Sequence, residues 1–182
     1  MMTFPTLPNA LTFLRILLIP VVIAAFFSNT QIGRWVAALG FCSACVTDYL
    51  DGFLARALSQ TSRLGQFLDP IADKMLVATT LLLLAGFDKI SQLAIIPATI
   101  ILCREILISG LRETLSHIQV DIPVSKLAKW KTFIQMVAIF TILIEDTTLP
   151  QKSHIGEILL WLAAGLTLVT MVDYLKRASK YF

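Results

Sequence analysis

Four aspartates stand at short, regular spacing within Thr47–Lys74, the stretch TDYLDGFLARALSQTSRLGQFLDPIADK. Asp48 and Asp51 are three residues apart, and Asp69 and Asp73 are four apart. Residues three or four apart lie on the same face of a helix, so each pair presents two carboxylates together. Carboxylates held close together repel one another and take up protons. The four acids therefore need compensating positive charge.

Divalent cations are the natural source of that charge, since two of them balance four carboxylates. A ligand set made only of oxygen atoms suits Mg²⁺ or Mn²⁺ and does not suit zinc. The aspartates therefore predict a site for two Mg²⁺ or Mn²⁺ ions.

Single aspartates of this stretch also have ordinary structural explanations. Asp69 precedes Pro70, and Asp-Pro is a common start of a helix. Lys74 is a natural ion-pair partner for Asp73. These explanations do not account for the gathering of all four acids beside one arginine and several small residues, which let a ligand approach the backbone. The neighbours are Gly52, Ala55, Arg56 and Gly65.

The elements that position these acids belong to a strongly apolar chain. The chain has 182 residues, is 57% hydrophobic and 15% charged, and has a mean hydropathy of +0.79. Soluble domains are typically about 45–50% apolar and about 25% charged. The composition therefore predicts an integral membrane protein, and we expect no nucleic-acid partner.

Six apolar segments approach the roughly 20 residues that a membrane-spanning helix needs. They are Leu11–Phe27, Trp35–Ala57, Gln66–Phe87, Leu93–Leu115, Leu127–Ile144 and Ile155–Leu175. We predict an all-α membrane protein with six transmembrane helices in a single domain, residues 1–182. Phe4, Pro5 and Pro8 suggest a short N-terminal interfacial segment before the first helix.

The distribution of Lys and Arg between the loops predicts the orientation of these spans. Six spans place both termini and two loops on one side, with nine cations; the opposite loops carry three, at Arg34, Lys89 and Lys152. Cytoplasmic loops are enriched in Lys and Arg, so both termini and the aspartate stretch are predicted to be cytoplasmic. The nine cations are Arg56, Arg63, Arg112, Lys126, Lys129, Lys131, Lys176, Arg177 and Lys180.

The aspartate stretch resembles the signature of the CDP-alcohol phosphatidyltransferase family. The signature is D-x-x-D-G-x-x-A-R, eight residues, then G-x-x-x-D-x-x-x-D, and all eight fixed positions match here. The six-span layout is also similar to this family, so the resemblance covers essentially the whole chain. The matched residues are Asp48, Asp51, Gly52, Ala55, Arg56, Gly65, Asp69 and Asp73.

The resemblance implies a role for each matched side chain. The four aspartates would hold two metal ions, and Asp73 would also take the proton of the acceptor hydroxyl as the catalytic base. The nucleotide of CDP-diacylglycerol would lie against Gly52, Ala55 and Arg56, whose guanidinium suits phosphate. Ser62 stands where some relatives contact the nucleotide.

Three further stretches resemble the bacterial members that use sn-glycerol 3-phosphate as acceptor. They are LPNALTFLRILLIP near the start, CREILISGLRE at Cys103–Glu113 and VSKLAKWKTFIQM at Val124–Met136. The implied reaction converts CDP-diacylglycerol and sn-glycerol 3-phosphate to phosphatidylglycerophosphate and CMP. This is a phosphotransferase reaction on substituted phosphate groups. The resemblance also implies a homodimer in the bacterial inner membrane.

An acceptor that carries a phosphate needs cations of its own. Lys126 and Lys129 are three residues apart and share a helix face, and Arg112 stands at the cytoplasmic end of the fourth span. We expect these three to bind the acceptor phosphate, although positive-inside topology alone also explains them. The role of Lys131 stays open. Arg104 and Glu105 lie mid-span, where an internal ion pair and a substrate contact are equally compatible.

Two other functions remain open. A family member with another acceptor, such as inositol phosphate or serine, would keep the aspartate signature and differ in the basic face. A divalent-cation transporter would also need intramembrane carboxylates, but transport pathways draw polar groups from several helices, often near the midplane. The acids of this chain cluster in one hairpin near one membrane face instead.

Overall fold

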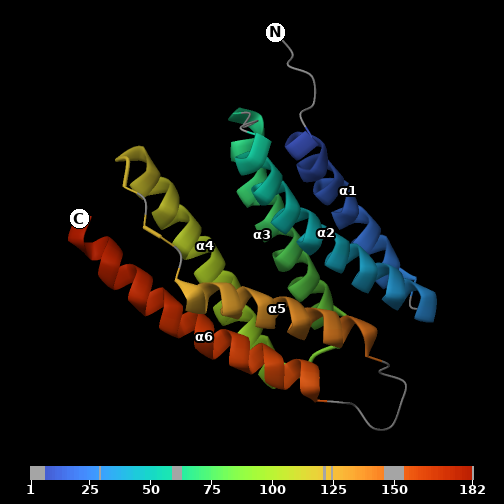
Figure 1. Cartoon of the computed structure of the whole chain (residues 1–182). Coiled ribbons are helices and arrows are strands. Elements are labelled where there is room, and N and C mark those ends of the chain that lie inside the picture. Colours follow the sequence, from blue (N-terminus) through green and yellow to red (C-terminus); the bar gives the residue numbers. More distant parts are fainter. Residues whose placement is uncertain are drawn as a thin grey trace. The chain divides into compact units, whose positions relative to one another are not determined.

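The computed structural model describes the backbone of residues 7–28, 30–58, 63–120, 122–123, 125–145 and 154–181. Within these ranges it describes all side chains except those of residues 7–11, 48–58, 63–67, 69 and 117. The described residues form six α-helices and two short 3₁₀ helices (Figure 1). They are α1 (Leu7–Phe27), α2 (Gln31–Leu58), α3 (Arg63–Gly86), η1 (Gln92–Ala94), α4 (Ile95–His117), α5 (Lys126–Ile144), α6 (Ile155–Ala178) and η2 (Ser179–Tyr181).

Each α-helix corresponds to one apolar segment predicted from the sequence, which confirms the all-helical class. The largest differences are four residues, at the starts of α1 and α2. Among the described residues, three segments are long and apolar enough to cross a membrane, and a fourth, Thr12–Phe27, is a shorter apolar helix. The three segments are Gln92–Ser116, Lys126–Ile144 and Ile155–Tyr181. The count of six spans stays a prediction.

The structure decides one alternative explanation and corrects one local expectation. Asp69-Pro70 does not start a helix, because α3 already begins at Arg63 and carries Pro70 in its interior. Proline has no N–H, so the helix loses one backbone hydrogen bond at this turn. The Nζ atom of Lys74 donates to the Pro70 carbonyl oxygen at 2.8 Å. Pro8 lies in the first turn of α1 rather than before it, whereas the rest of the predicted interfacial segment lies outside the described residues.

The chain divides into two compact units, Met1–Leu83 and Leu84–Phe182. In the first unit, α1 packs along α2 (Figure 1). The contact is close because α2 presents small residues to α1: a Cβ added at Gly40 would lie 3.2 Å from Cγ2 of Val22. The buried apolar side chains of this pair are Ile19, Val22, Ala25 and Phe26 on α1, with Ala37, Ala38, Phe41 and Ala44 on α2.

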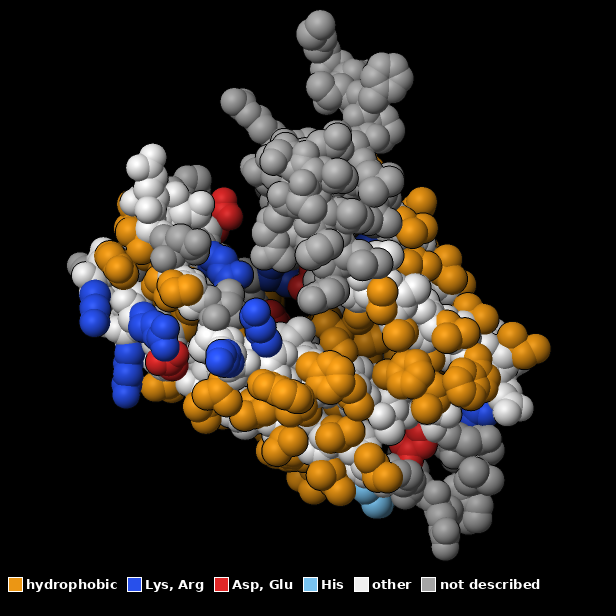
Figure 2. Space-filling model, viewed as in Figure 1, with side chains coloured by type: hydrophobic (Ala, Val, Ile, Leu, Met, Phe, Trp, Pro, Cys, Tyr) orange, Lys and Arg blue, Asp and Glu red, His pale blue; other side chains and the backbone are white. Residues whose placement is uncertain are grey.

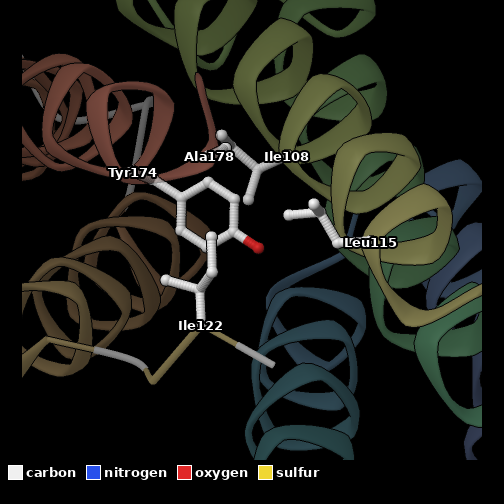
Figure 3. Packing of buried hydrophobic residues seen from close by; sticks show 5 residues of the cluster. All are labelled: Ile108, Leu115, Ile122, Tyr174 and Ala178. Carbon is white, nitrogen blue, oxygen red and sulfur yellow. The ribbon is translucent and has the colours of Figure 1, made fainter. Parts of the chain in front are cut away.

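In the second unit, α6 packs along both α4 and α5 (Figure 1). One core cluster consists of Ile108 and Leu115 of α4, Ile122, and Tyr174 and Ala178 of α6. Figure 3 shows the Tyr174 ring among these side chains, with its hydroxyl directed toward Leu115. This cluster joins the C-terminal halves of α4 and α6 to the connection that leads into α5.

Polar contacts fix two connections of the second unit, the loop before η1 and the connection between α4 and α5. At one end, the Glu157 carboxylate of α6 accepts hydrogen bonds from the Ser91 backbone N–H at 2.7 Å and from its hydroxyl at 2.8 Å. At the other end, Gln119 has a left-handed φ of 57°, and the Val120 N–H bonds back to the Leu115 carbonyl. This pairing is a Schellman C-cap, which turns the chain away from α4.

The outer surface of the second unit is apolar, and Figure 2 shows hydrophobic side chains covering much of the visible face. Trp130 and Phe133 of α5 are exposed and meet edge to face, with ring centroids 6.0 Å apart. On α6, Ile158, Leu162 and Val169 are more than half exposed. A large exposed apolar surface is rare on a soluble monomer, so this face suits contact with lipid.

The crossing of α5 and α6 yields a test of the packing. A Cβ at Gly156 would lie 2.5 Å from Cγ1 and 3.2 Å from the backbone nitrogen of Ile142. Gly156→Ala should therefore lower the free energy of unfolding by about 1–3 kcal/mol, the usual cost of overpacking. Thermal unfolding of the purified protein measures the change.

Gly165 on the same helix is the matched control, because a Cβ there would meet nothing within 4 Å. Gly165→Ala should stabilise the protein by up to about 1 kcal/mol, since alanine is the better helix former. Equal stability of the two variants would contradict the close approach of α5 and α6 at Gly156.

Candidate functional site

The structure places the four aspartates on two helices. Asp48 and Asp51 lie near the C-terminal end of α2, and Asp69 and Asp73 lie in the first half of α3. Both stretches are α-helical, so the spacings of three and four residues put each pair on one helix face. The side chains of the first three lie outside the described residues, and that of Asp73 is half-buried.

The residues expected to bind the nucleotide continue the same face of α2. Gly52, Ala55 and Arg56 follow Asp48 by four, seven and eight residues, which is the repeat of one helix face. Small residues and an arginine therefore lie in line with two acids over the last turns of α2. Ser62 lies outside the described residues.

The residues expected to bind the acceptor phosphate lie in the second unit. Arg112 stands in the last two turns of α4, and Lys126 and Lys129 in the first turn of α5; all three are exposed. The hydroxyl of Ser125 caps α5 by accepting from the Ala128 N–H at 3.2 Å. Figure 2 shows Lys and Arg side chains gathered over the start of α5 and the end of α6.

Lys131 differs from its two neighbours on α5. It is 2% exposed, and its ammonium donates a hydrogen bond to Oε1 of Glu105 on α4. The same Oε1 lies 3.5 Å from Nη1 of Arg104. The charged residues that the sequence left open therefore form one ionic cluster, called here the Glu105 cluster: Arg104, Glu105 and Lys131.

Most of the buried polar atoms without a partner in the second unit belong to residues that the sequence analysis did not single out. Within the described residues of this unit, five such atoms have no hydrogen-bond partner: Nε of Arg104, Oε1 of Gln135, Oε1 of Glu145, Oγ1 of Thr167 and the Tyr174 hydroxyl. Arg104 and Gln135 lie within apolar spans, where such side chains are rare, and that rarity was the available signal for them. Arg104 also lines a cavity of about 580 Å³ between α4 and α6, whose walls are otherwise largely apolar.

Comparison with known proteins decides the family. The sequence pattern of the CDP-alcohol phosphatidyltransferases matches residues 5–169. The chain belongs to the CDP-alcohol phosphatidyltransferase family. The match spans the aspartate signature and all three residues of the predicted acceptor site.

Several relatives of this phosphatidyltransferase match nearly full length. A protein of Rickettsia felis named CDP-diacylglycerol--glycerol-3-phosphate 3-phosphatidyltransferase is 43% identical over 178 residues, covering 97% of each chain. A protein of the same name from Shigella flexneri serotype 5b is 40% identical over 174 residues, covering 94% of each.

The fold of this phosphatidyltransferase is similar to that of a crystal structure of Mycobacterium tuberculosis phosphatidylinositol phosphate synthase with CDP-DAG bound. The TM-score is 0.63 at 17% sequence identity, over 92% of this chain and 85% of that one. At this identity the likeness concerns the fold alone, so it does not decide which acceptor this chain uses.

The cap of α5 yields a prediction for this part of the molecule. Ser125→Ala removes the side chain that accepts from the Ala128 N–H and should lower stability by about 1 kcal/mol. Thermal unfolding measures the loss. Ser116→Ala, at an exposed position near the end of α4, should leave the melting temperature unchanged. A loss of the same size in both variants would argue against the cap.

Proposed function

We propose that this chain transfers the phosphatidyl group of CDP-diacylglycerol to sn-glycerol 3-phosphate, giving phosphatidylglycerophosphate and CMP. The observation that carries the proposal is the near full-length identity of 40–43% to relatives named for this reaction. The complete aspartate signature within the matched region supports it. The exposed basic residues of the second unit suit an acceptor that bears a phosphate.

Four carboxylates from two helices form a donor set that fits two hard divalent cations. We propose that Asp48, Asp51 and Asp69, together with Asp73, would hold two Mg²⁺ or Mn²⁺ ions. Bound there, the ions would supply the positive charge that a pyrophosphate substrate and a departing CMP require. The helical spacing of each acid pair supports this assignment.

The same helix face of α2 would bind the donor substrate. The small side chains of Gly52 and Ala55 leave room for the nucleotide against the backbone, and Arg56 offers its planar set of donors to phosphate. Ser62 would add a contact to the nucleotide. Asp73 would accept the proton of the attacking hydroxyl on its carboxylate, as a general base within hydrogen-bond reach.

Arg112, Lys126 and Lys129 would bind the phosphate of the acceptor. All three are exposed and stand at one end of the second unit, where the cations of the α6 terminus also lie. This one-sided charge supports an orientation with that end in the cytoplasm. We propose a six-span homodimer of the bacterial inner membrane, with its active site facing the cytoplasm.

Acceptor assays separate this proposal from the alternatives. Purified protein with CDP-diacylglycerol and Mg²⁺ should convert labelled sn-glycerol 3-phosphate to lipid, and it should use inositol phosphate and serine poorly. Excess chelator should abolish turnover, because the four acids would lose their counter-charge. Preference for inositol phosphate or serine would keep the family and refute the acceptor. Cation flux into vesicles without lipid synthesis would indicate a transporter instead.

Asp69 and Asp73 should differ when each is changed to asparagine. Asp69→Asn weakens a metal ligand, so added metal should restore part of the activity. Asp73→Asn also removes the proton acceptor, so turnover should fall by about 10²–10⁴-fold even at saturating metal. Initial rates across a Mg²⁺ series, together with binding of CDP-diacylglycerol, measure the difference.

Lys74→Ala is the control for this pair. If Asp73 served mainly as an ion-pair partner of its neighbour, then Lys74→Ala would be as damaging as Asp73→Asn. The Lys74 ammonium donates to the Pro70 carbonyl oxygen, so we expect Lys74→Ala to keep most of its activity. Near-normal turnover of Asp73→Asn would refute the catalytic role of Asp73.

A further inference from the structure

The Glu105 cluster is a direct link between α4 and α5. Both helices pack closely along α6, whereas they approach each other less closely. The long side chain of Lys131 bridges this separation and brings its ammonium to Glu105 across 26 residues of sequence. The distance and register between α4 and α5 therefore depend on α6 and on this ion pair.

Stability alone is a poor explanation for this cluster. Replacing a buried ion pair by well-packed apolar residues is often neutral or stabilising, because desolvation offsets the attraction between the charges. Lys131 is 3% exposed in its side chain and Glu105 20%, so both charges are largely removed from water. Because desolvation of these two charges is costly, the best explanation for the pair is that it fixes the placement of α4 relative to α5.

Two cations contact the same oxygen of Glu105. Its Oε1 accepts from Lys131 and lies 3.5 Å from Nη1 of Arg104. Arg104 also lines the largely apolar cavity between α4 and α6, whose described lining residues include no carboxylate. Glu105 is therefore an anion that Arg104 and Lys131 share.

The helix geometry relates this cluster to the predicted acceptor site. Arg112 follows Glu105 by seven residues, which places it on the same face of α4 about 10 Å further along the axis. On α5, Lys126 and Lys129 precede Lys131 by five and two residues, or about 7 Å and 3 Å along the axis. The cluster thus lies within two helical turns of every predicted phosphate-binding cation.

We propose that Glu105 and Lys131 are positioning residues that set the separation between Arg112 on α4 and the two lysines at the start of α5. The inference rests on the proposed function, since it assigns these three cations to the acceptor phosphate. Lys131 itself is buried and pairs with Glu105. It acts through the placement of α5 rather than by binding phosphate.

Steady-state kinetics of the full-length protein test the inference. Glu105→Gln and Lys131→Met should each lower kcat/KM for sn-glycerol 3-phosphate by about 10- to 100-fold, as small misplacements of binding groups do. The KM for CDP-diacylglycerol should stay unchanged. The double variant should lose much less activity than the product of the two single losses, because both variants remove the Lys131–Glu105 interaction. Lys131→Arg, which keeps the cation, should retain most of the activity.

Two further variants serve as references. On α6, Oδ2 of Asp173 lies 2.9 Å from Nη2 of Arg177 in an exposed ion pair. Asp173→Asn breaks this pair and should leave the KM for each of the two substrates unchanged. Lys126→Ala should raise the KM for the acceptor, as direct loss of a phosphate contact. Glu105→Asp keeps the charge but shortens its reach. It should show the same acceptor defect, and it replaces Glu105→Gln if that variant does not fold.

The outcomes separate the inference from the proposed function. A defect in Lys131→Met without one in Glu105→Gln would mean that Lys131 binds the acceptor directly, which overturns the inference. Loss of thermal stability with unchanged kinetics would also overturn it. If the wild-type protein used only inositol phosphate, the proposed acceptor would be wrong. The same variants assayed with that phosphate-bearing acceptor would then still decide the positioning role.

Discussion

The exclusion of water from a hydrocarbon environment constrains most of what this chain does. Backbone groups that cannot reach water must bond within the chain, and helices satisfy this requirement segment by segment. The same exclusion makes each charge inside a span costly unless it is paired. The apolar helices therefore form first as local structures, and the few internal charges determine how particular helices are placed. The Glu105 cluster is the clearest described example.

Small residues complement the charges in arranging the helices. Packing between helices in lipid gains little from the hydrophobic effect, so van der Waals contact between closely fitting surfaces drives their association. Gly40 brings α2 against Val22 of α1, and Gly156 brings α6 against Ile142 of α5. In the described part of the chain, close packing joins helix pairs within each unit, and polar contacts such as Ser91 with Glu157 fix the connections.

The sequence predicted the helices well because long apolar runs leave few alternatives. It left Asp69-Pro70 open to two explanations, and the structure places this dipeptide inside α3, as the predicted segment Gln66–Phe87 does. It also could not link Lys131 to Glu105, because periodicity tells which residues share a face but not which faces meet. For the aspartates, helical spacing fixes each pair on its own helix, and the family match supports their role. Their convergence on metal remains a prediction, because three of the four side chains lie outside the described residues.

The contact between Ser91 and Glu157 has a consequence for biosynthesis. The two residues are 66 positions apart, so α4 and α5 are both synthesised before the carboxylate that holds the loop ahead of α4. Until α6 begins to form, the Ser91 N–H and O–H cannot donate to the Glu157 carboxylate, although the hydroxyl oxygen can already accept from the Ala94 N–H. The loop ahead of α4 in the nascent second unit therefore lacks its contact with Glu157 until α6 has been synthesised. Synthesis of α6 supplies this contact. A chain truncated before α6 would therefore lack the hydrogen bonds between Ser91 and Glu157, even if α4 and α5 had inserted correctly.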